Sequence, residues 1–107
     1  MRRVQLESPY AGDVEFNIKY ARDCARDCLK RGEAPFASHL LYTQEGILIE
    51  GIPKERALGI EAGLVWGQAA ELTVVYEDYG ISECMRRGIE RAKAEGRPVE
   101  YRRLYKD

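Results

Sequence analysis

Apolar and polar residues follow two rhythms along this chain, and together they predict four strands separated by helices. The first segment alternates in the period of a strand, with Val4 and Leu6 on one side, and it ends before Pro9 because proline has no amide hydrogen to donate to a sheet. The segment of residues 71–78 is a nearly continuous apolar run, which is typical of a parallel strand covered on both faces. The predicted strands are residues 3–8, 34–38, 71–78 and 98–105.

A helical rhythm begins after the first strand. Asp13 is a good N-cap, and the helix that it starts is expected to run to about Arg31, with Gly32 just past its end. Apolar residues at three- and four-residue spacing give this helix one apolar stripe that should face the core. The stripe consists of Phe16, Tyr20, Cys24, Ala25 and Cys28.

Two further helices follow. One opens at Pro53 and should last about fourteen residues, since proline suits a first helical turn. The other is capped by Ser82, runs to about Glu95 and stops at Gly96. The helix after Pro53 repeats glycine every four residues, which would let it approach another backbone closely, at Gly59, Gly63 and Gly67.

The alternation of strands and helices predicts an α/β fold in which a small parallel sheet of about four strands is covered by helices on both faces, a three-layer sandwich. The length of 107 residues fits a single domain, 1–107. Ligands of such sheets bind at the carboxyl ends of the strands. A ligand site is therefore expected where the predicted strands end.

Composition narrows the classes of function. Apolar residues make up 45% and charged residues 33% of the chain, an ordinary soluble globular profile, and a net charge of −1 with mixed signs argues against binding of polymeric nucleic acid. No apolar run approaches the length of a membrane span. An odd count of three cysteines indicates a reducing compartment, so we expect a cytoplasmic protein. One histidine and three dispersed cysteines lack the spacing of a metal site, and we expect no metal and no cofactor.

The segment "SPYAGD" places Ser8, Tyr10 and Gly12 just before a helix N-terminus. Free amides and the helix dipole there favour an anion such as a phosphate, although an ordinary strand-to-helix turn has the same pattern. His39 is the only histidine and follows a predicted strand. It could contact a ligand or donate a proton, or it could be hydrogen-bonded within its loop.

The clearest predicted strand, residues 71–78, ends in the carboxylates Glu77 and Asp78. Carboxylates at this place often bind ribose hydroxyls in this class of fold, although a solvated strand end is an equal alternative. Glu83 lies in the first turn of a helix, where its charge favours the dipole. Trp66 is expected in the core. Cys24 and Cys28 share one helix face and are expected there too.

In order and spacing, five segments resemble the nucleoside 2-deoxyribosyltransferase-like superfamily, and more narrowly a small branch of uncharacterised bacterial and phage proteins of about this length. The resemblance covers nearly the whole chain and implies a flavodoxin-like fold, a small-molecule nucleoside or nucleotide ligand and a homo-oligomer. The segments are "SPYAGD" (8–13), "PFASHLLYTQ" (35–44), "GIEAGL" (59–64), "ELTVVY" (71–76) and "GISECMRRGIERAKAEGRPVEY" (80–101).

The resemblance also implies roles for individual residues. Ser8, Tyr10 and Gly12 would line the sugar or phosphate side of the pocket, and His39 would lie at its mouth. The loop before the last helix would contact the sugar or phosphate through Asp78, Gly80 and Ser82.

Active members of the superfamily use a helix glutamate as nucleophile, and its position falls on Gly88. Glycine costs a helix interior about 1 kcal/mol relative to alanine, so this glycine either leaves space beside a ligand or permits close packing. Glu83 lies about 140° away around the helix and does not simply replace the missing group. Carboxylates that could act instead are Glu61, Glu77, Asp78 and Glu83.

Three functions follow from these patterns. The first is a nucleotide- or nucleoside-derivative binding protein that lacks the usual nucleophile. The alternative is an N-glycosidic bond hydrolase or deoxyribosyltransferase with a relocated carboxylate, and the second alternative is a non-catalytic interaction domain. Turnover of a nucleoside separates the first two.

Overall fold

The computed structural model describes residues 1–49 and 51–105 and has the α/β architecture that the sequence predicts. Four parallel strands form one sheet in the order β2-β1-β3-β4. The central pair is in register from Val4 opposite Leu72 to Glu7 opposite Val75. The strands are β1 (Arg3–Glu7), β2 (Ala34–Phe36), β3 (Leu72–Tyr76) and β4 (Val99–Arg102).

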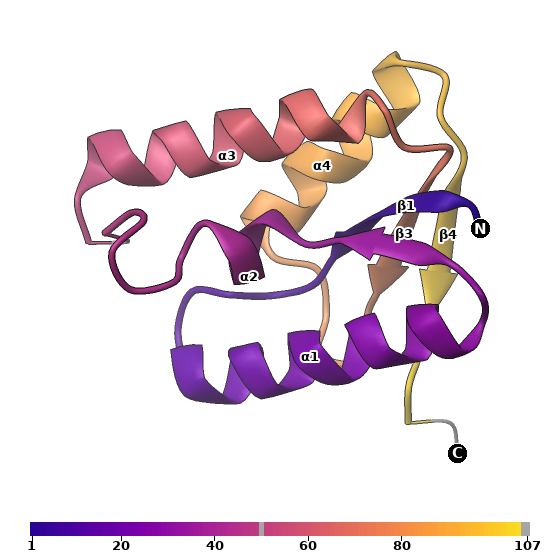
Figure 1. Ribbon diagram of the computed structural model, residues 1–107, viewed down its shortest axis with the longest axis horizontal. Helices are drawn as coiled ribbons and strands as arrows, with labels where there is room; N and C mark the ends of the chain where they lie inside the picture. Colours follow the sequence, from indigo (N-terminus) through magenta and orange to yellow (C-terminus); the bar gives the residue numbers. More distant parts are fainter. Residues whose placement is uncertain (50, 106–107) are drawn as a thin grey trace.

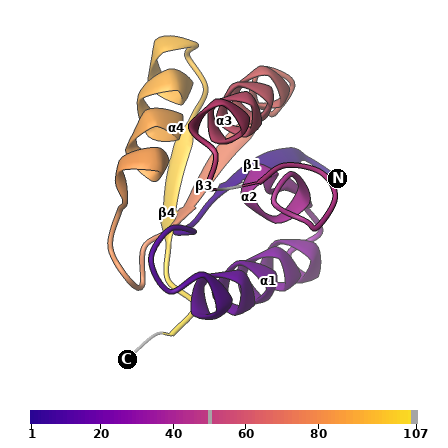
Figure 2. The same ribbon diagram turned by 90° about the vertical axis from the view of Figure 1, so that its left-hand side faces the viewer.

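Helices cover both faces of this sheet, which confirms the predicted three layers (Figures 1 and 2). Helix α1 packs on one face, whereas α3 and α4 lie side by side on the other. The short α2 lies in the long connection after β2, and it packs against α3. The helices are α1 (Val14–Lys30), α2 (Ser38–Leu41), α3 (Pro53–Gly67) and α4 (Glu83–Ala94).

Local signals fix the helix ends where the sequence places them. The Asp13 carboxylate accepts a hydrogen bond from the Phe16 amide at 3.2 Å, and the Ser82 hydroxyl accepts one from the Met85 amide at 3.3 Å. Gly96 ends α4 with a φ of +73°, a left-handed conformation that only glycine adopts without strain.

The two faces of the sheet differ in polarity. Toward α1 the sheet is apolar, and Tyr20, Cys24 and Cys28 complete a closed cluster, which confirms the two cysteines as core residues. Toward α3 and α4 an apolar cluster surrounds Val75, but it covers only part of the face. Polar side chains of the sheet, Gln5, Glu7 and Thr73, occupy the rest.

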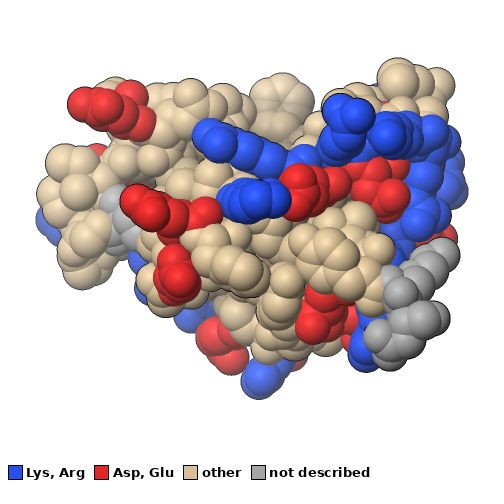
Figure 3. Space-filling model, turned by 90° about the horizontal axis from the view of Figure 1, so that it is seen from below, with Lys and Arg blue, Asp and Glu red and all other residues tan. Residues whose placement is uncertain are grey.

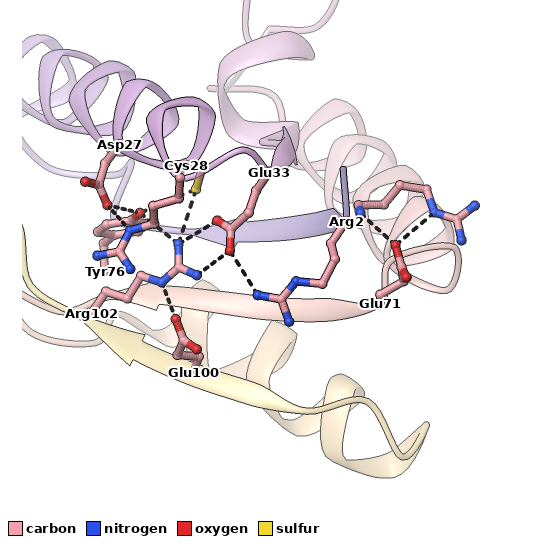
Figure 4. Close-up of polar contacts among 10 residues, drawn as sticks. Arg2, Asp27, Cys28, Glu33, Glu71, Tyr76, Glu100 and Arg102 are labelled. Carbon is pink, nitrogen blue, oxygen red and sulfur yellow. Dashed lines mark hydrogen bonds and ion pairs between the residues drawn. The ribbon is translucent and has the colours of Figure 1, made fainter.

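Between α1 and the strands, a buried ion pair joins the residue before β2 to the last residue of β4 (Figure 4). The Arg102 guanidinium donates to both carboxylate oxygens of Glu33, at 2.8 and 2.7 Å. The same guanidinium donates to the Tyr76 hydroxyl, which in turn donates to Asp27 at 2.6 Å. Every charge in this cluster has a partner, as burial requires.

Two aromatic predictions are wrong. Phe16 is 46% exposed because the first turn of α1 carries it away from the sheet, where it packs on Tyr79 with ring centroids 5.0 Å apart. Trp66 is 58% exposed because α3 packs inward through its glycines. A β-carbon on Gly63 would lie 2.7 Å from that of Ser38, which shows how closely α3 approaches α2.

The face seen from below in Figure 3 carries acidic and basic side chains next to one another. Two i,i+4 ion pairs on α1, Lys19–Asp23 and Arg31–Asp27, are examples of opposite charges that lie next to one another. The mixture agrees with the mixed charge of the sequence, although basic side chains gather at the upper right of this view.

Candidate functional site

A cavity of about 130 Å³ opens at the carboxyl end of β1, among α2, α3 and the start of α4. This is the place where parallel α/β sheets bind ligands. Of the residues predicted to contact a ligand, the cavity brings together five, namely Ser8, Tyr10, His39, Ser82 and Gly88. Residues 8 and 88 meet there although most of the chain separates them.

Glu7, which sequence reasoning missed, also lines the cavity. Side chains alternate along a strand, so Glu7 and Gln5 point to the same face of β1, toward α3 and α4. A β-carbon on Gly88 would lie 2.5 Å from the carboxyl carbon of Glu7 and closer still to one of its oxygens. The glycine in α4 therefore gives room to the Glu7 carboxyl, and this is the packing reason for a residue that weakens a helix.

The Glu7 carboxyl lies in surroundings that disfavour its charge. Burial raises its pKa to about 8, against the opposing influence of a hydrogen bond from Gln5 and of the Arg97 charge. The Arg97 guanidinium is itself held by Glu95 at 2.7 Å and by Thr73 at 3.0 Å. At neutral pH most Glu7 side chains are therefore protonated and can donate a hydrogen bond.

Ser8 and His39 form a second polar unit in the cavity. The Ser8 hydroxyl lies 2.6 Å from Nε2 of His39, and the two residues are 31 positions apart in the sequence. Burial lowers the pKa of His39 to about 4, so its ring is neutral at pH 7. Thr43 donates to the backbone carbonyl of His39 at 2.6 Å, which fixes the turn after α2. The site thus combines a protonated acid with a neutral imidazole.

Positive charge gathers on the α3 and α4 side of the cavity, where Arg56 and Arg87 line it. Arg56 lies within hydrogen-bond distance of the Cys84 thiol, at 3.2 Å. Guanidinium groups bind phosphates and carboxylates through paired donors. Sequence reasoning missed both arginines, because each lies on the exposed surface of its helix with no local motif around it.

The remaining predicted residues do not line this cavity, and their roles stay predictions. Those predicted to contact a ligand are Gly12, Asp78 and Gly80, and those predicted as alternative catalytic carboxylates are Glu61, Glu77, Asp78 and Glu83.

Asp78 instead anchors the C-terminal segment. Its Oδ1 accepts hydrogen bonds from the Tyr20 hydroxyl and the Leu104 amide, and its Oδ2 accepts one from the Tyr105 amide. Burial alone would raise the pKa of Asp78, but these hydrogen bonds bring it below the ordinary value. The described part of the tail, up to residue 105, thus packs on its own chain, while residues 106 and 107 lie outside the described structure.

Two exclusions hold for residues 1–49 and 51–105. They contain no cluster of three or more histidine, cysteine, aspartate or glutamate side chains that could hold a metal ion. They also contain no helix with the length and apolar character needed to span a membrane.

Comparison with known proteins gives a family and a fold. The family model DUF7768, described as a domain of unknown function, matches residues 2–102, and the chain belongs to that family. No curated protein matches. Among solved structures, a 2-deoxyribosyltransferase from Bacillus psychrosaccharolyticus is similar with a TM-score of 0.59 and 17% identity, over 98% of this chain and 74% of that one. At this identity the likeness concerns the fold, which is that of a deoxyribosyltransferase.

Proposed function

For this member of the DUF7768 family, we propose that the cavity at the end of β1 binds a nucleoside or nucleotide derivative. The observation that carries the proposal is the Ser8–His39 pair, 2.6 Å apart, facing the same cavity as the Glu7 carboxyl. These groups offer neutral donors and acceptors of the kind that sugar hydroxyls and base edges require. The solved protein of similar fold is named as an enzyme that acts on deoxyribosyl groups, and this supports the same class of ligand.

Arg56 and Arg87 extend the proposal to a phosphate. Both line the cavity, and a guanidinium pair of this kind stabilises a phosphate through charge-assisted hydrogen bonds. A nucleoside monophosphate should therefore bind more tightly than the corresponding nucleoside. The absence of a carboxylate at Gly88 favours a binding protein over an enzyme of the usual kind, unless another carboxyl of the cavity acts.

A thermal-shift titration tests the proposal, because a ligand that binds only the folded protein raises the melting temperature by mass action. Nucleosides, their monophosphates and ADP-ribose-like compounds are the probes, with free bases and inorganic phosphate as controls. Ser8→Ala and Tyr10→Phe should reduce the shift that the best compound causes. Asp13→Ala should lower the melting temperature without ligand and leave the ligand-induced shift intact, since Asp13 caps α1 outside the cavity.

The same titration separates the phosphate contact from the rest of the site. Arg87→Met should remove most of the advantage of the monophosphate over the nucleoside and leave binding of the nucleoside itself. If no probe raises the melting temperature, the proposal is wrong and a non-catalytic interaction domain becomes the better reading.

Two further predictions accompany this proposal. The resemblance to the superfamily predicts a homo-oligomer, which light scattering of the purified protein tests directly. The odd number of cysteines predicts a cytoplasmic protein. Fractionation of the cells that produce the protein tests the second prediction.

A further inference from the structure

Glu7 differs from the second acid of the cavity in how its carboxyl is held. The only other acid that lines the cavity within the described residues is Glu55, and Oε1 of Glu55 accepts a hydrogen bond from the Ile49 amide at 3.0 Å. Glu7 has no ion pair among the described residues, and it projects from the end of a central strand over the bare backbone of Gly88. Glu7 is half-buried, and a carboxyl that lines a cavity without a counter-charge is costly to hold there, so such groups collect at functional sites.

We propose that Glu7 is the catalytic carboxyl of this cavity and acts as a general acid in the hydrolysis of an N-glycosidic bond. The inference rests on the proposed function, since it assumes a nucleoside-type ligand in the cavity. The inference gives the catalytic role to a residue of β1. The position on α4 at which the superfamily carries its glutamate is Gly88 here, and glycine has no side chain that could act.

The reaction balances with this one carboxyl. The protonated oxygen of Glu7 gives its proton to the ring nitrogen of the leaving base while the C1′–N bond breaks and its electron pair stays on nitrogen. Water then adds to the anomeric carbon and loses a proton to the Glu7 carboxylate. The C1′–N bond and one O–H bond of water are replaced by C1′–O and N–H bonds, and Glu7 ends protonated as it began.

Protonation favours an acid over a nucleophile. Because burial raises the pKa of Glu7 to about 8, the carboxyl carries its proton at neutral pH, which suits proton donation and not attack on carbon. The neutral His39 adds no positive charge that would lower this pKa. The position of the carboxyl is also well defined, because Glu7 is part of a sheet strand and its carboxyl packs against the backbone of α4 at Gly88.

Release of free base, measured by chromatography, tests the assignment on three proteins: wild type, Glu7→Gln and Glu90→Gln. Glu90 is an exposed acid on α4 outside the cavity and serves as the matched control. The amide of Glu7→Gln keeps the size of the side chain but cannot release a proton, so kcat should fall by about 10²–10⁴-fold. The ligand-induced thermal shift should persist in Glu7→Gln, and Glu90→Gln should behave as wild type.

The pH profile gives a second readout. Wild-type kcat should fall above pH 8, where Glu7 loses its proton, and the residual rate of Glu7→Gln should lack this decline. Gly88→Ala is an independent variant for the case in which Glu7→Gln does not fold. Its added methyl group displaces the Glu7 carboxyl, and a misplacement of this kind can cost about 10²-fold in rate.

The outcomes that overturn the inference differ from those that overturn the proposed function. Binding without any base release by wild type rejects the catalytic role and leaves nucleoside binding in place. Base release by Glu7→Gln at the wild-type rate does the same. A covalent sugar adduct on Glu7 would make it a nucleophile and reject the acid role. If no probe binds at all, both proposals are wrong.

Discussion

Two glutamates lie on opposite faces of one small sheet, Glu33 buried and Glu7 half-buried, and they are held in opposite ways. Glu33 receives two hydrogen bonds from the Arg102 guanidinium, and this partner lowers its pKa (Figure 4). Glu7 has no ion-pair partner among the described residues, and burial raises its pKa to about 8. A buried charge with a partner belongs to the structure of the chain, whereas a carboxyl without a counter-charge remains available to a ligand. The comparison therefore supports the proposal that the ligand binds on the face toward α3 and α4.

The largest expected effect comes from removing the partner of Glu33. Arg102→Met leaves a carboxylate that is 5% exposed without its main counter-charge, and breaking such a buried pair should cost about 3–5 kcal/mol of unfolding free energy. Urea denaturation measures it. Arg103→Met, on the exposed neighbouring residue, is the control and should change stability little.

A double variant shows that the cost is that of an unpaired charge. Arg102→Met combined with Glu33→Met should recover most of the lost stability, because apolar side chains of similar volume replace buried pairs at little cost. A double variant as unstable as the single one would mean that packing around Arg102, and not its charge, supports the fold.

The second effect is a loss of stability with rising pH that Glu7 alone should cause. Between its ordinary pKa of 4.5 and about 8, the folded state holds a proton on Glu7 that the unfolded state lacks, so stability falls as pH rises. His39 acts in the opposite sense between about 4 and 6.5, where the unfolded state holds the extra proton. The two opposing dependences overlap below pH 6.5, and Glu7 acts alone above it.

Wild type should therefore lose about 1.5 kcal/mol of unfolding free energy between pH 6.5 and 8, because the slope of roughly 1.4 kcal/mol per pH unit falls to half as Glu7 reaches its pKa of about 8. The paired carboxylates with lowered pKa values titrate in acid, and the thiols and phenols with raised values affect stability only above about pH 9, so neither group interferes. Denaturation at several pH values measures the slope. Glu7→Gln should abolish it and Glu83→Gln should keep it, while a flat wild-type curve would contradict the raised pKa.

The third effect is a coupling between Gly88 and Glu7. In a Glu7→Ala background, Gly88→Ala should stabilise α4 by about 1 kcal/mol, because alanine is the better helix former. With Glu7 present, the added methyl group meets the carboxyl, and this gain should be lost or reversed. A double-mutant cycle should give a coupling free energy of about 1–2 kcal/mol, within the range for residues in contact. Additive effects would show that the carboxyl turns away at no cost, and the packing explanation of Gly88 would then be wrong.

The fold could be predicted from the sequence because its signals are local. Asp13 and Ser82 cap helices, Pro53 opens one, and Gly32 and Gly96 follow helix ends, so most element boundaries are fixed within a few residues of their cause. The alternation of strands and helices then implies the parallel sheet. Exposure was harder to predict, as Trp66 shows, because a stripe of small residues and not the largest side chain decides which side of α3 packs inward.

The site could be predicted only in part. The rule that ligands bind at strand ends leads to Ser8 and His39, which the cavity does bring together. The same rule leads equally to Asp78, whose carboxylate oxygens accept hydrogen bonds from the Tyr20 hydroxyl and from two backbone amides of the C-terminal segment. These partners lie between 26 and 58 positions from Asp78 along the chain, so no local pattern shows them. The strand pattern does contain a signal for Glu7: in a sheet covered on both faces, the alternation that buries Leu6 on one face directs Glu7 toward the helices on the other.

The smallest effect concerns the second partner of Glu33. The Arg2 guanidinium lies 3.2 Å from the same carboxylate that Arg102 holds, but its side chain is 56% exposed, against 4% for Arg102. Water screens the exposed pair, so Arg2→Ala should cost at most about 1 kcal/mol, and added salt should reduce that cost further. Urea denaturation at low and high salt measures both. A cost equal to that of Arg102→Met would show that the Glu33 carboxylate depends on two partners, and the contrast with Glu7 would then rest on the number of counter-charges and not on their burial.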